Sequence, residues 1–378
     1  MSLTESDKGR GASGTVPTFG VEEEFFLADH ETRATVARAP DVLKRARDLL
    51  GDRIGPELFT TTVETRTHPV GTLDEMRQEL RRLREGLGAA AEEGGCRLVA
   101  SGTPVIPFRG QREIVEEPRY RQLAELYGPF VHDDRNTGAC ACHVHVAVSG
   151  REEAVRLCNH LRPWLPVLQA IAANSPFQDG RDSGFASWRA LHFGRWPHVG
   201  PTPPFRDAAA YDALVDTLIA SGMLQDRKHV YWYARPSEHW PTLEVRVPDV
   251  NADLDVVLLL ASLTRALVGV LLPEVRRDAP APDVVDPLLR AAHWRAARDG
   301  LRGSGLDPLT GRLRPAPELA ERLIARAMPA LEETGEAPFV RSAWGRLRTG
   351  GGGAERQRAA YARRGDLRDV VDLLSVRT

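Results

Sequence analysis

Short stretches of the chain alternate between hydrophobic and polar residues, which is the period of a β-strand with one buried face. Residues 18–28 (TFGVEEEFFLA) are rich in Phe and Val and are followed by the polar run DHET. Residues 57–67 (ELFTTTVETRT) and 139–148 (ACACHVHVAV) alternate in the same way. We predict strands at these three places and at three shorter stretches, residues 96–101, 231–234 and 242–247.

Apolar residues that recur every three or four positions predict the helices. The clearest helix spans residues 72–93, because Thr72 and Glu75 form a capping box at its start and two glycines follow its end. Residues 174–205 contain many Gly, Pro and Arg residues without a clear period, and a loop of this length in a compact protein is usually functional. Further helices are predicted at residues 41–50, 152–173 (kinked at its prolines), 207–222, 252–272 and 354–374.

Strands that carry acidic residues and are separated by long helices predict an α+β fold, with helices packed on one face of a sheet. The order of the elements favours antiparallel pairing only weakly. Residues 1–17 are polar and rich in small residues, so we expect a disordered tail there. Residues 18–378 contain no Ser/Gly/Pro-rich linker in their middle, which predicts a single domain.

Composition and charge narrow the range of partners. The 50 Lys and Arg residues nearly balance the 52 Asp and Glu residues and are interspersed with them, so no nucleic acid partner is expected. Residues 256–272 are apolar but short for a bilayer, and Arg265 lies near their middle, which predicts a buried core helix and no membrane partner. Four cysteines do not make a disulfide scaffold in a chain this long, and no export signal is evident, so we expect a cytoplasmic protein. The sequence leaves open whether the chain forms a homodimer.

Acidic residues and histidines occupy strand positions where alternation would also allow apolar residues. Glu22 and Glu24 share one face of the first predicted strand, and His143 and His145 share one face of a later strand. Mg²⁺ is usually held by a few carboxylates together with waters and substrate phosphates. The set therefore suits two or more Mg²⁺ ions that bridge a nucleotide, with Mn²⁺ as an alternative ion. The other acids of this set are Glu57, Glu64 and Glu244.

Each part of this set also has a structural interpretation. The two Glu-x-Arg motifs, at residues 64–66 and 244–246, are common as ion pairs on solvated strand faces, and only their combination with the other acids favours a metal site. A His-x-His pair on a strand occurs in zinc sites, in iron sites and in hydrogen-bonded cores. Cys140 and Cys142 alternate away from the histidines, so we interpret them as core residues and not as zinc ligands.

Several arginines are candidates for capturing phosphate or carboxylate groups through bidentate contacts. Surface solubility is the alternative role for any one of them. The chain has no GxxxxGK(S/T) loop, GxGxxG fingerprint, GxSxG elbow or DFG motif, so the common phosphate cradles and the serine-hydrolase elbow are not supported. The candidates are Arg181, Arg189, Arg195, Arg235, Arg295 and Arg298.

The sequence resembles that of type 2 glutamate–cysteine ligases, also called carboxylate–amine ligases. The resemblance runs in unbroken order from about residue 19 to the C-terminus. The similar blocks include GVEEEFFL, ELFTTTVETRT, LVASGTPVIP, CHVHVAV, NSPFQDGRDSGFASWRALHFGRWPHVGPTPPF, TLEVRVPD, HWRAARDGL and GGGGAERQRAAYARRGDLRDVVDLL.

This resemblance implies a glutamine-synthetase-like fold, in which an antiparallel sheet forms a funnel lined by metal-binding acids and helices pack on its outer face. Residues 18–378 would then be one carboxylate–amine ligase catalytic domain. The implied metal ligands are Glu22, Glu24, Glu57, Glu64, His145 and Glu244, with His143 a weaker match. The implied catalytic residues are Arg189, Arg235, Arg246 and His145, and the nucleotide is expected at Arg235, Arg246, Arg295 and Arg298.

The implied activity is an ATP-dependent ligation. A carboxylate, by family default the γ-carboxylate of glutamate, attacks the γ-phosphate of ATP to give an acyl phosphate, and cysteine or another amine displaces the phosphate. The family usually carries an Asn where this chain has Ala292 and His293, which leaves the amine open. A divalent-metal hydrolase that uses the same cluster without ATP is the alternative, and a catalytically silent metal- or nucleotide-binding protein is a third hypothesis.

Overall fold

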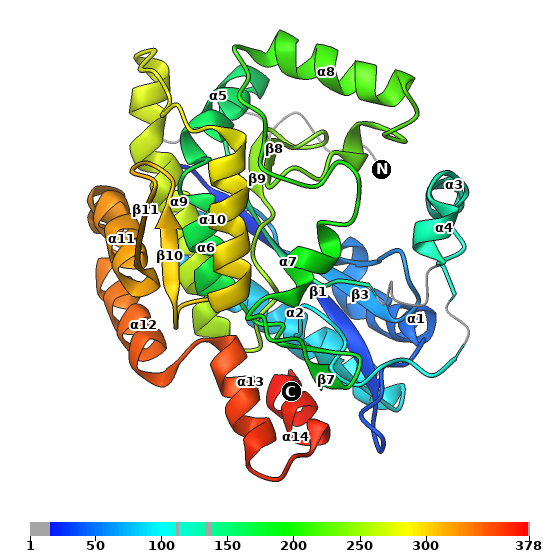
Figure 1. Ribbon diagram of the computed structural model, residues 1–378. Coiled ribbons are helices and arrows are strands. Elements are labelled where there is room, and N and C mark those ends of the chain that lie inside the picture. The colour runs from blue at the N-terminus through cyan, green and yellow to red at the C-terminus, as the bar shows by residue number, and fades with distance from the viewer. Residues whose placement is uncertain (1–15, 111–112, 133–137, 377–378) are drawn as a thin grey trace.

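The protein has an α+β fold built around one antiparallel sheet (Figure 1). The computed structural model describes residues 16–110, 113–132 and 138–376 of the 378-residue chain. Among these residues the main sheet has seven strands in the order β2-β3-β1-β5-β9-β8, with β4 also paired to β1. The strands are β1 Phe19–Asp29, β2 Ile54–Pro56, β3 Thr62–Arg66, β4 Cys96–Val99, β5 Cys142–Ala147, β8 Ala234–Pro236 and β9 Thr242–Val245.

All the pairings recorded in this sheet are antiparallel, as predicted, and the sheet is open, with β2 and β8 at its edges. Strand β1 lies at the centre. It pairs with β3 on one side, and on the other side with β5 along residues 19–23 and with β4 along residues 26–29. The long strand therefore places its side chains beside those of three other strands.

Alternation along β1 separates an apolar face from an acidic face. Val21 and Phe25 are buried in the cores, whereas Glu22 and Glu24 are half-buried on the opposite side of the strand. Glu23 lies on the apolar side with no exposed surface, and its carboxylate accepts hydrogen bonds from the buried guanidinium of Arg84 at 2.6 and 2.9 Å. A buried carboxylate needs such a partner, because an isolated charge would be costly there.

Helices cover the apolar face of the sheet (Figure 1). The central one is α9, Leu254–Arg276, which is long and apolar enough to cross a membrane, although 89% of its most apolar window is buried inside the protein. The predicted buried core helix is thus confirmed. Arg265 is accommodated within it, because its guanidinium pairs with Glu336 at 2.7 Å and donates a hydrogen bond to the carbonyl of Pro17.

The other helices surround α9 or pack on the flanks of the sheet. The capping box predicted at Thr72 and Glu75 is present at the start of α2. The described helices other than α9 are α1 Ala39–Leu50, α2 Leu73–Glu93, α3 Pro118–Leu126, α4 Gly128–Val131, α5 Arg151–Leu161, α6 Leu165–Ala172, α7 Trp188–Phe193, α8 Ala208–Ala220, α10 Asp286–Asp299, α11 Ala316–Glu333, α12 Ala337–Gly350, α13 Gly353–Ala362 and α14 Leu367–Leu374.

Several element boundaries differ from the predictions. The strand predicted at residues 57–67 begins only at Thr62, so Glu57 lies in the connection after β2. The helix predicted at 152–173 is interrupted between α5 and α6, because proline lacks the N–H group that a continuous helix needs. The long loop at 174–205 contains α7 and the short hairpin β6 (Phe177–Gln178) and β7 (Arg181–Asp182). The predicted C-terminal helix is divided into α13 and α14.

The remaining predictions on domain organisation are not decided by the fold. The tail predicted at residues 1–17 lies outside the described residues except for Val16 and Pro17, which adjoin α9. The single domain at 18–378 stays a prediction.

Candidate functional site

A row of charged side chains crosses the sheet on the face opposite the helical core. Directly opposed residues on antiparallel strands lie on the same face, so the register decides which side chains meet. The register places Glu24 opposite Glu64, and His145 opposite Glu244. It continues the row with Glu22 opposite both Arg66 and His143, and with Arg235 opposite Glu244.

Glu22, His145 and Glu244 form a group able to hold a metal ion. One ligand atom from each lies within 4.8 Å of the others. The imidazole of His145 is oriented by a 3.0 Å contact between its Nδ1 and the hydroxyl of Thr242, which leaves Nε2 facing the Glu22 carboxylate at 3.6 Å. That Nε2 is buried without a hydrogen-bond partner. An oriented, unpartnered imidazole nitrogen between two carboxylates fits a divalent cation.

His143 lies at the centre of the acidic face. Its Nδ1 is 3.4 Å from Glu22 and 3.7 Å from Glu244, and its Nε2 is 3.8 Å from Glu24. Burial and the nearby guanidinium of Arg246 lower the pKa of His143 below its ordinary value. His143 therefore connects the two halves of the row, although the sequence had favoured His145.

A second group of acids, Glu24, Glu57 and Glu64, lies toward β3. Burial and the charges of Glu24 and Glu64 hold the pKa of Glu57 well above its ordinary value. Burial raises the pKa of Glu64 to about 7, even though Arg66 pairs with it at 2.8 Å and opposes this shift. Carboxylates that repel one another in this way would be relieved by a bound cation. Among the described residues, however, only Glu22, His145 and Glu244 bring their ligand atoms within 4.8 Å of one another.

The acids beside the histidines behave in the opposite way. Burial alone would raise the pKa of Glu22, but the neighbouring imidazoles of His143 and His145 lower it well below its ordinary value. Burial also opposes ionisation of Glu244, but the positive charges of Arg235 and Arg246 outweigh it and lower its pKa. These two carboxylates are therefore ionised at neutral pH.

Three of the predicted arginines surround the row. Arg235 donates to Glu244 through Nε at 2.6 Å, and Arg246 pairs with the same carboxylate. Arg189, on α7, donates hydrogen bonds to the carbonyls of Arg246 and Val247 at 3.1 and 3.3 Å. Arg189 and Arg246 also line a pocket beside the acids.

Other predicted arginines are placed elsewhere. Arg295 lies on α10, where it pairs with Asp299 at 3.2 Å, and Arg298 stacks over Trp294 on the same helix. Neither lines the pocket beside the acids. Arg181 lies in the exposed strand β7. A nucleotide-binding role of Arg295 and Arg298 therefore stays a prediction.

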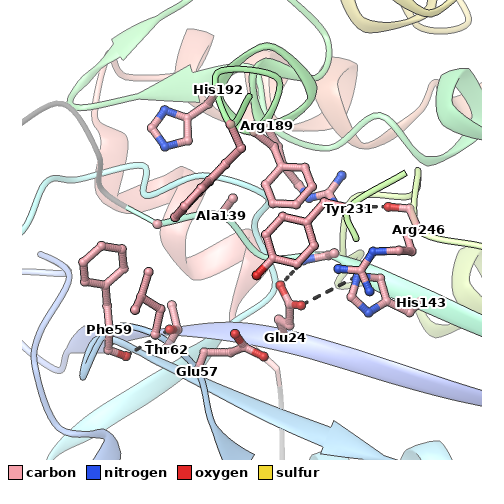
Figure 2. Close-up of a pocket in the computed structure, with 15 residues that line it drawn as sticks. Glu24, Glu57, Phe59, Thr62, Ala139, His143, Arg189, His192, Tyr231 and Arg246 are labelled. Carbon is pink, nitrogen blue, oxygen red and sulfur yellow. Dashed lines mark hydrogen bonds and ion pairs between the residues drawn. The ribbon is translucent and has the colours of Figure 1, made fainter. Parts of the chain in front are cut away.

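The pocket beside the acids is open to solvent (Figure 2). Its acidic side is formed by Glu24, Glu57 and His143, and its basic side by Arg189 and Arg246. Figure 2 shows the ring of Tyr231 between these two sides, with its hydroxyl group directed toward Glu24. The rest of the lining combines the rings of Phe59, His192, Phe193, Trp196 and Tyr231 with the smaller residues Leu58, Thr62, Gly138, Ala139 and Ala141.

Asp249 forms an ion pair with Arg189. Asp249 was not identified as a site residue from the sequence. Its carboxylate accepts hydrogen bonds from the hydroxyls of Ser175 and Ser187 at 2.7 and 2.9 Å and lies 3.5 Å from Arg189. It also accepts the backbone N–H of Asn174 at 2.9 Å. Asn174, Ser175 and Ser187 come from the loop at 174–205, which has no periodicity. Only the frequency of polar residues there could have indicated that they belong to the site.

Comparison with known proteins identifies the family. Residues 18–373 match the model of glutamate-cysteine ligase family 2 (GCS2). The chain belongs to this family. A candidate glutamate–cysteine ligase 2 of Salinispora arenicola is 47% identical over 363 residues, which cover 96% of this chain and 95% of that protein. As a member of the family, the protein is a carboxylate–amine ligase.

Solved structures share the fold at much lower sequence identity. The glutamate–cysteine ligase of Francisella tularensis, in complex with AMP, matches with a TM-score of 0.69 and 13% identity, over 96% of this chain and 88% of that one. A bifunctional glutathione synthetase of Pasteurella multocida matches with a TM-score of 0.68 and 13% identity, over 95% of this chain. This family-2 chain spans about half of that longer protein, 52% of its length.

Proposed function

We propose that the protein is an ATP-dependent ligase that joins a carboxylate, by family default the γ-carboxylate of glutamate, to an amine through an acyl phosphate. The observation that carries this proposal is the meeting of four acids and two histidines on one sheet face, joined by Glu57 from the connection after β2, beside a pocket with two arginines. The complex of the Francisella tularensis relative with AMP supports an adenine nucleotide as co-substrate.

Two neighbouring metal positions are proposed. Glu22, His145 and Glu244 would hold one ion. Glu24, Glu57 and Glu64, whose mutual repulsion raises two of their pKa values, would hold another. Mg²⁺, or Mn²⁺ in its place, would neutralise the negative charge on the phosphoryl oxygens.

The side chains have separate tasks in this proposal. Arg246 and Arg189, which line the pocket, attract the oxygens of the transferred phosphoryl group or of the substrate carboxylate. Arg235 is oriented by its ion pair with Glu244 and lies at the edge of the row of charged side chains. There it would help to attract the same oxygens. Ligation through an acyl phosphate needs no protein nucleophile, which agrees with four cysteines that are all buried and free.

The buried, unpaired thiols also support the proposed cytoplasmic location, because such thiols persist in reducing compartments. The proposed partners are an amino-acid carboxylate and an amine.

The decisive experiment is an ADP-release assay with Mg²⁺ and ATP, in which glutamate and a panel of amines are added singly and together. We expect ADP only when both substrates are present, and an amide product by mass spectrometry. Hydrolysis of a substrate without ATP would contradict the ligase and favour the metal-dependent hydrolase.

A variant series links that activity to the site. Glu244→Gln and Glu64→Gln should each lower kcat by at least about 100-fold, because each removes a charge from a proposed metal position. The matched control is Glu332→Gln, at an exposed acid on α11 that pairs with Arg341, and it should keep full activity. A folded Glu244→Gln enzyme with normal kcat would contradict the metal assignment.

A further inference from the structure

The apolar wall of the pocket is a rigid aromatic cluster. Trp196 and Tyr231 pack edge to face with ring centroids 6.1 Å apart, and Phe193 lies 5.2 Å from Tyr231. The ring of Phe130 packs edge to face on Trp196, with the ring centroids 4.5 Å apart. The guanidinium of Arg189 lies 5.6 Å from the ring of Phe193. Rings held by this many neighbours form a fixed surface and do not rearrange freely around a ligand.

These rings share one pocket with Glu24, Glu57 and His143, so a group that touches the rings lies next to the proposed reacting centre. The base of ATP is separated from its γ-phosphate by a ribose and two phosphates, and it therefore belongs farther from the acids. Glutamate presents a charged ammonium and a charged carboxylate beyond its reacting group, which the acids and arginines of the pocket satisfy and its rings do not. The remaining candidate is the side chain of the amine substrate.

We propose that the amine substrate carries an aromatic ring, which packs against Phe193, Trp196 and Tyr231. This inference rests on the proposed function and specifies the substrate class of that site. The side chain of cysteine would leave most of this wall uncovered, whereas an aromatic ring would bury it and pack in an edge-to-face or offset arrangement.

The chemistry of the step is unchanged by this choice. The amine nitrogen forms a bond to the acyl carbon of the acyl phosphate, and the bond from that carbon to the phosphate oxygen breaks. Inorganic phosphate leaves with the bonding electrons, and the proton lost by the amine passes to solvent. The aromatic ring takes part only by positioning the nitrogen.

The first test compares amines on the unmodified enzyme with Mg²⁺, ATP and glutamate. Phenethylamine should show a kcat/KM at least about tenfold above that of cysteine or ethylamine, as expected when an apolar pocket is filled. A preference for cysteine or ethylamine would overturn the inference while leaving the proposed ligase intact. Absence of ADP release with any amine would overturn the proposed function itself, and this inference with it.

The second test uses matched variants. Phe193→Ala should lower kcat/KM for phenethylamine by about tenfold more than it lowers kcat/KM for ethylamine. Phe339→Ala is the control, because Phe339 is also a half-buried ring beneath an arginine, Arg77, but lies on α12 away from the pocket. Trp196→Phe should give the same selective loss in a milder form. A rise in the KM for ATP instead of the amine would overturn the inference.

Discussion

Individual carboxylates in the site differ because of their neighbours. Glu22 and Glu244 lie beside histidines and arginines, so their charged forms are favoured. Glu57 and Glu64 lie among other acids, so their charged forms are disfavoured. Such repulsion lowers the free energy of unfolding of the metal-free protein, and a bound cation would remove this effect. Local stability is therefore reduced where the proposed chemistry occurs.

Replacement of Glu57 should reveal this effect. Its folded pKa is raised, so its ionised form destabilises the metal-free fold once the pH exceeds the ordinary value for a glutamate. We expect Glu57→Gln to raise the Tm of the metal-free protein at pH 8 by about 2 °C or more, and to reduce the further rise on adding Mg²⁺. Thermal scans with EDTA and with Mg²⁺ measure both effects. A lower Tm without metal would contradict the interpretation.

Asp249 is expected to act through Arg189. Asp249→Asn keeps the shape of the side chain but removes the charge that faces the guanidinium at 3.5 Å, so Arg189 loses part of its orientation. We expect kcat/KM for ADP release to fall by about tenfold.

A double-mutant cycle separates this role from a purely structural one. Adding Asp249→Asn to Arg189→Ala should cost little beyond the loss caused by Arg189→Ala alone, because the two residues act as one unit. Fully additive losses would show that Asp249 does not work through Arg189.

At the scale of elements, regular strands were predictable and irregular segments were not. Alternation in 18–28 and 139–148 placed Glu22, Glu24, His143 and His145 on one face correctly, because a pleated strand fixes side-chain direction locally. The alternation in 57–67 already begins at Glu57, although the chain enters β3 only at Thr62. Trp196 and Asp249 were missed because their positions depend on contacts with distant segments, which no local period records.

The contact between α13 and the loop that begins at Asn174 can be tested by one substitution. A Cβ atom at Gly353 would lie 2.1 Å from Oδ1 of Asn174, so Gly353→Ala should force α13 away from the loop and cost roughly 1–3 kcal/mol of stability. Gly345→Ala is the matched control in α12, where a Cβ atom meets nothing within 4 Å. The control should be neutral or slightly stabilising, since Ala favours helices over Gly. Urea unfolding of both variants measures the difference, and equal effects would contradict the tight contact.

At the scale of the whole molecule, two large cores lie on the helical side of the sheet, and the acidic face and its pocket lie opposite them. The order of acid-bearing strands and long helices predicted a sheet with helices on its other face, and the resemblance to a known family implied that metal-binding acids line the open face. The aromatic cluster of the pocket continues through His198 and His229, whose ring centroids lie 4.5 Å apart and 5.0 and 4.8 Å from that of Tyr231.

These two histidines predict how stability depends on pH. Burial lowers the pKa of His198 to about 4 and that of His229 to about 2, so both stay neutral in the folded protein. The unfolded chain takes up protons below about pH 6.5, and stability is therefore lost as the pH falls from that value toward 4. We expect His198→Phe to weaken this loss, measured by urea unfolding between pH 7 and 4.5. His239→Phe, at an exposed position, should leave the slope unchanged. An unchanged slope in His198→Phe would contradict this origin.

The contact between α13 and the loop that begins at Asn174 also affects when the site can form during translation. Gln357 of α13 donates hydrogen bonds to the backbone carbonyl and the side chain of Asn174, whose N–H is bound by Asp249 beneath Arg189. Every strand of the main sheet precedes α13 in the chain. A nascent chain can thus form its sheet and its acidic face on the ribosome, but it can complete the support of Arg189 only after α13 has emerged. The order of translation would delay the support of Arg189 until these late segments have folded.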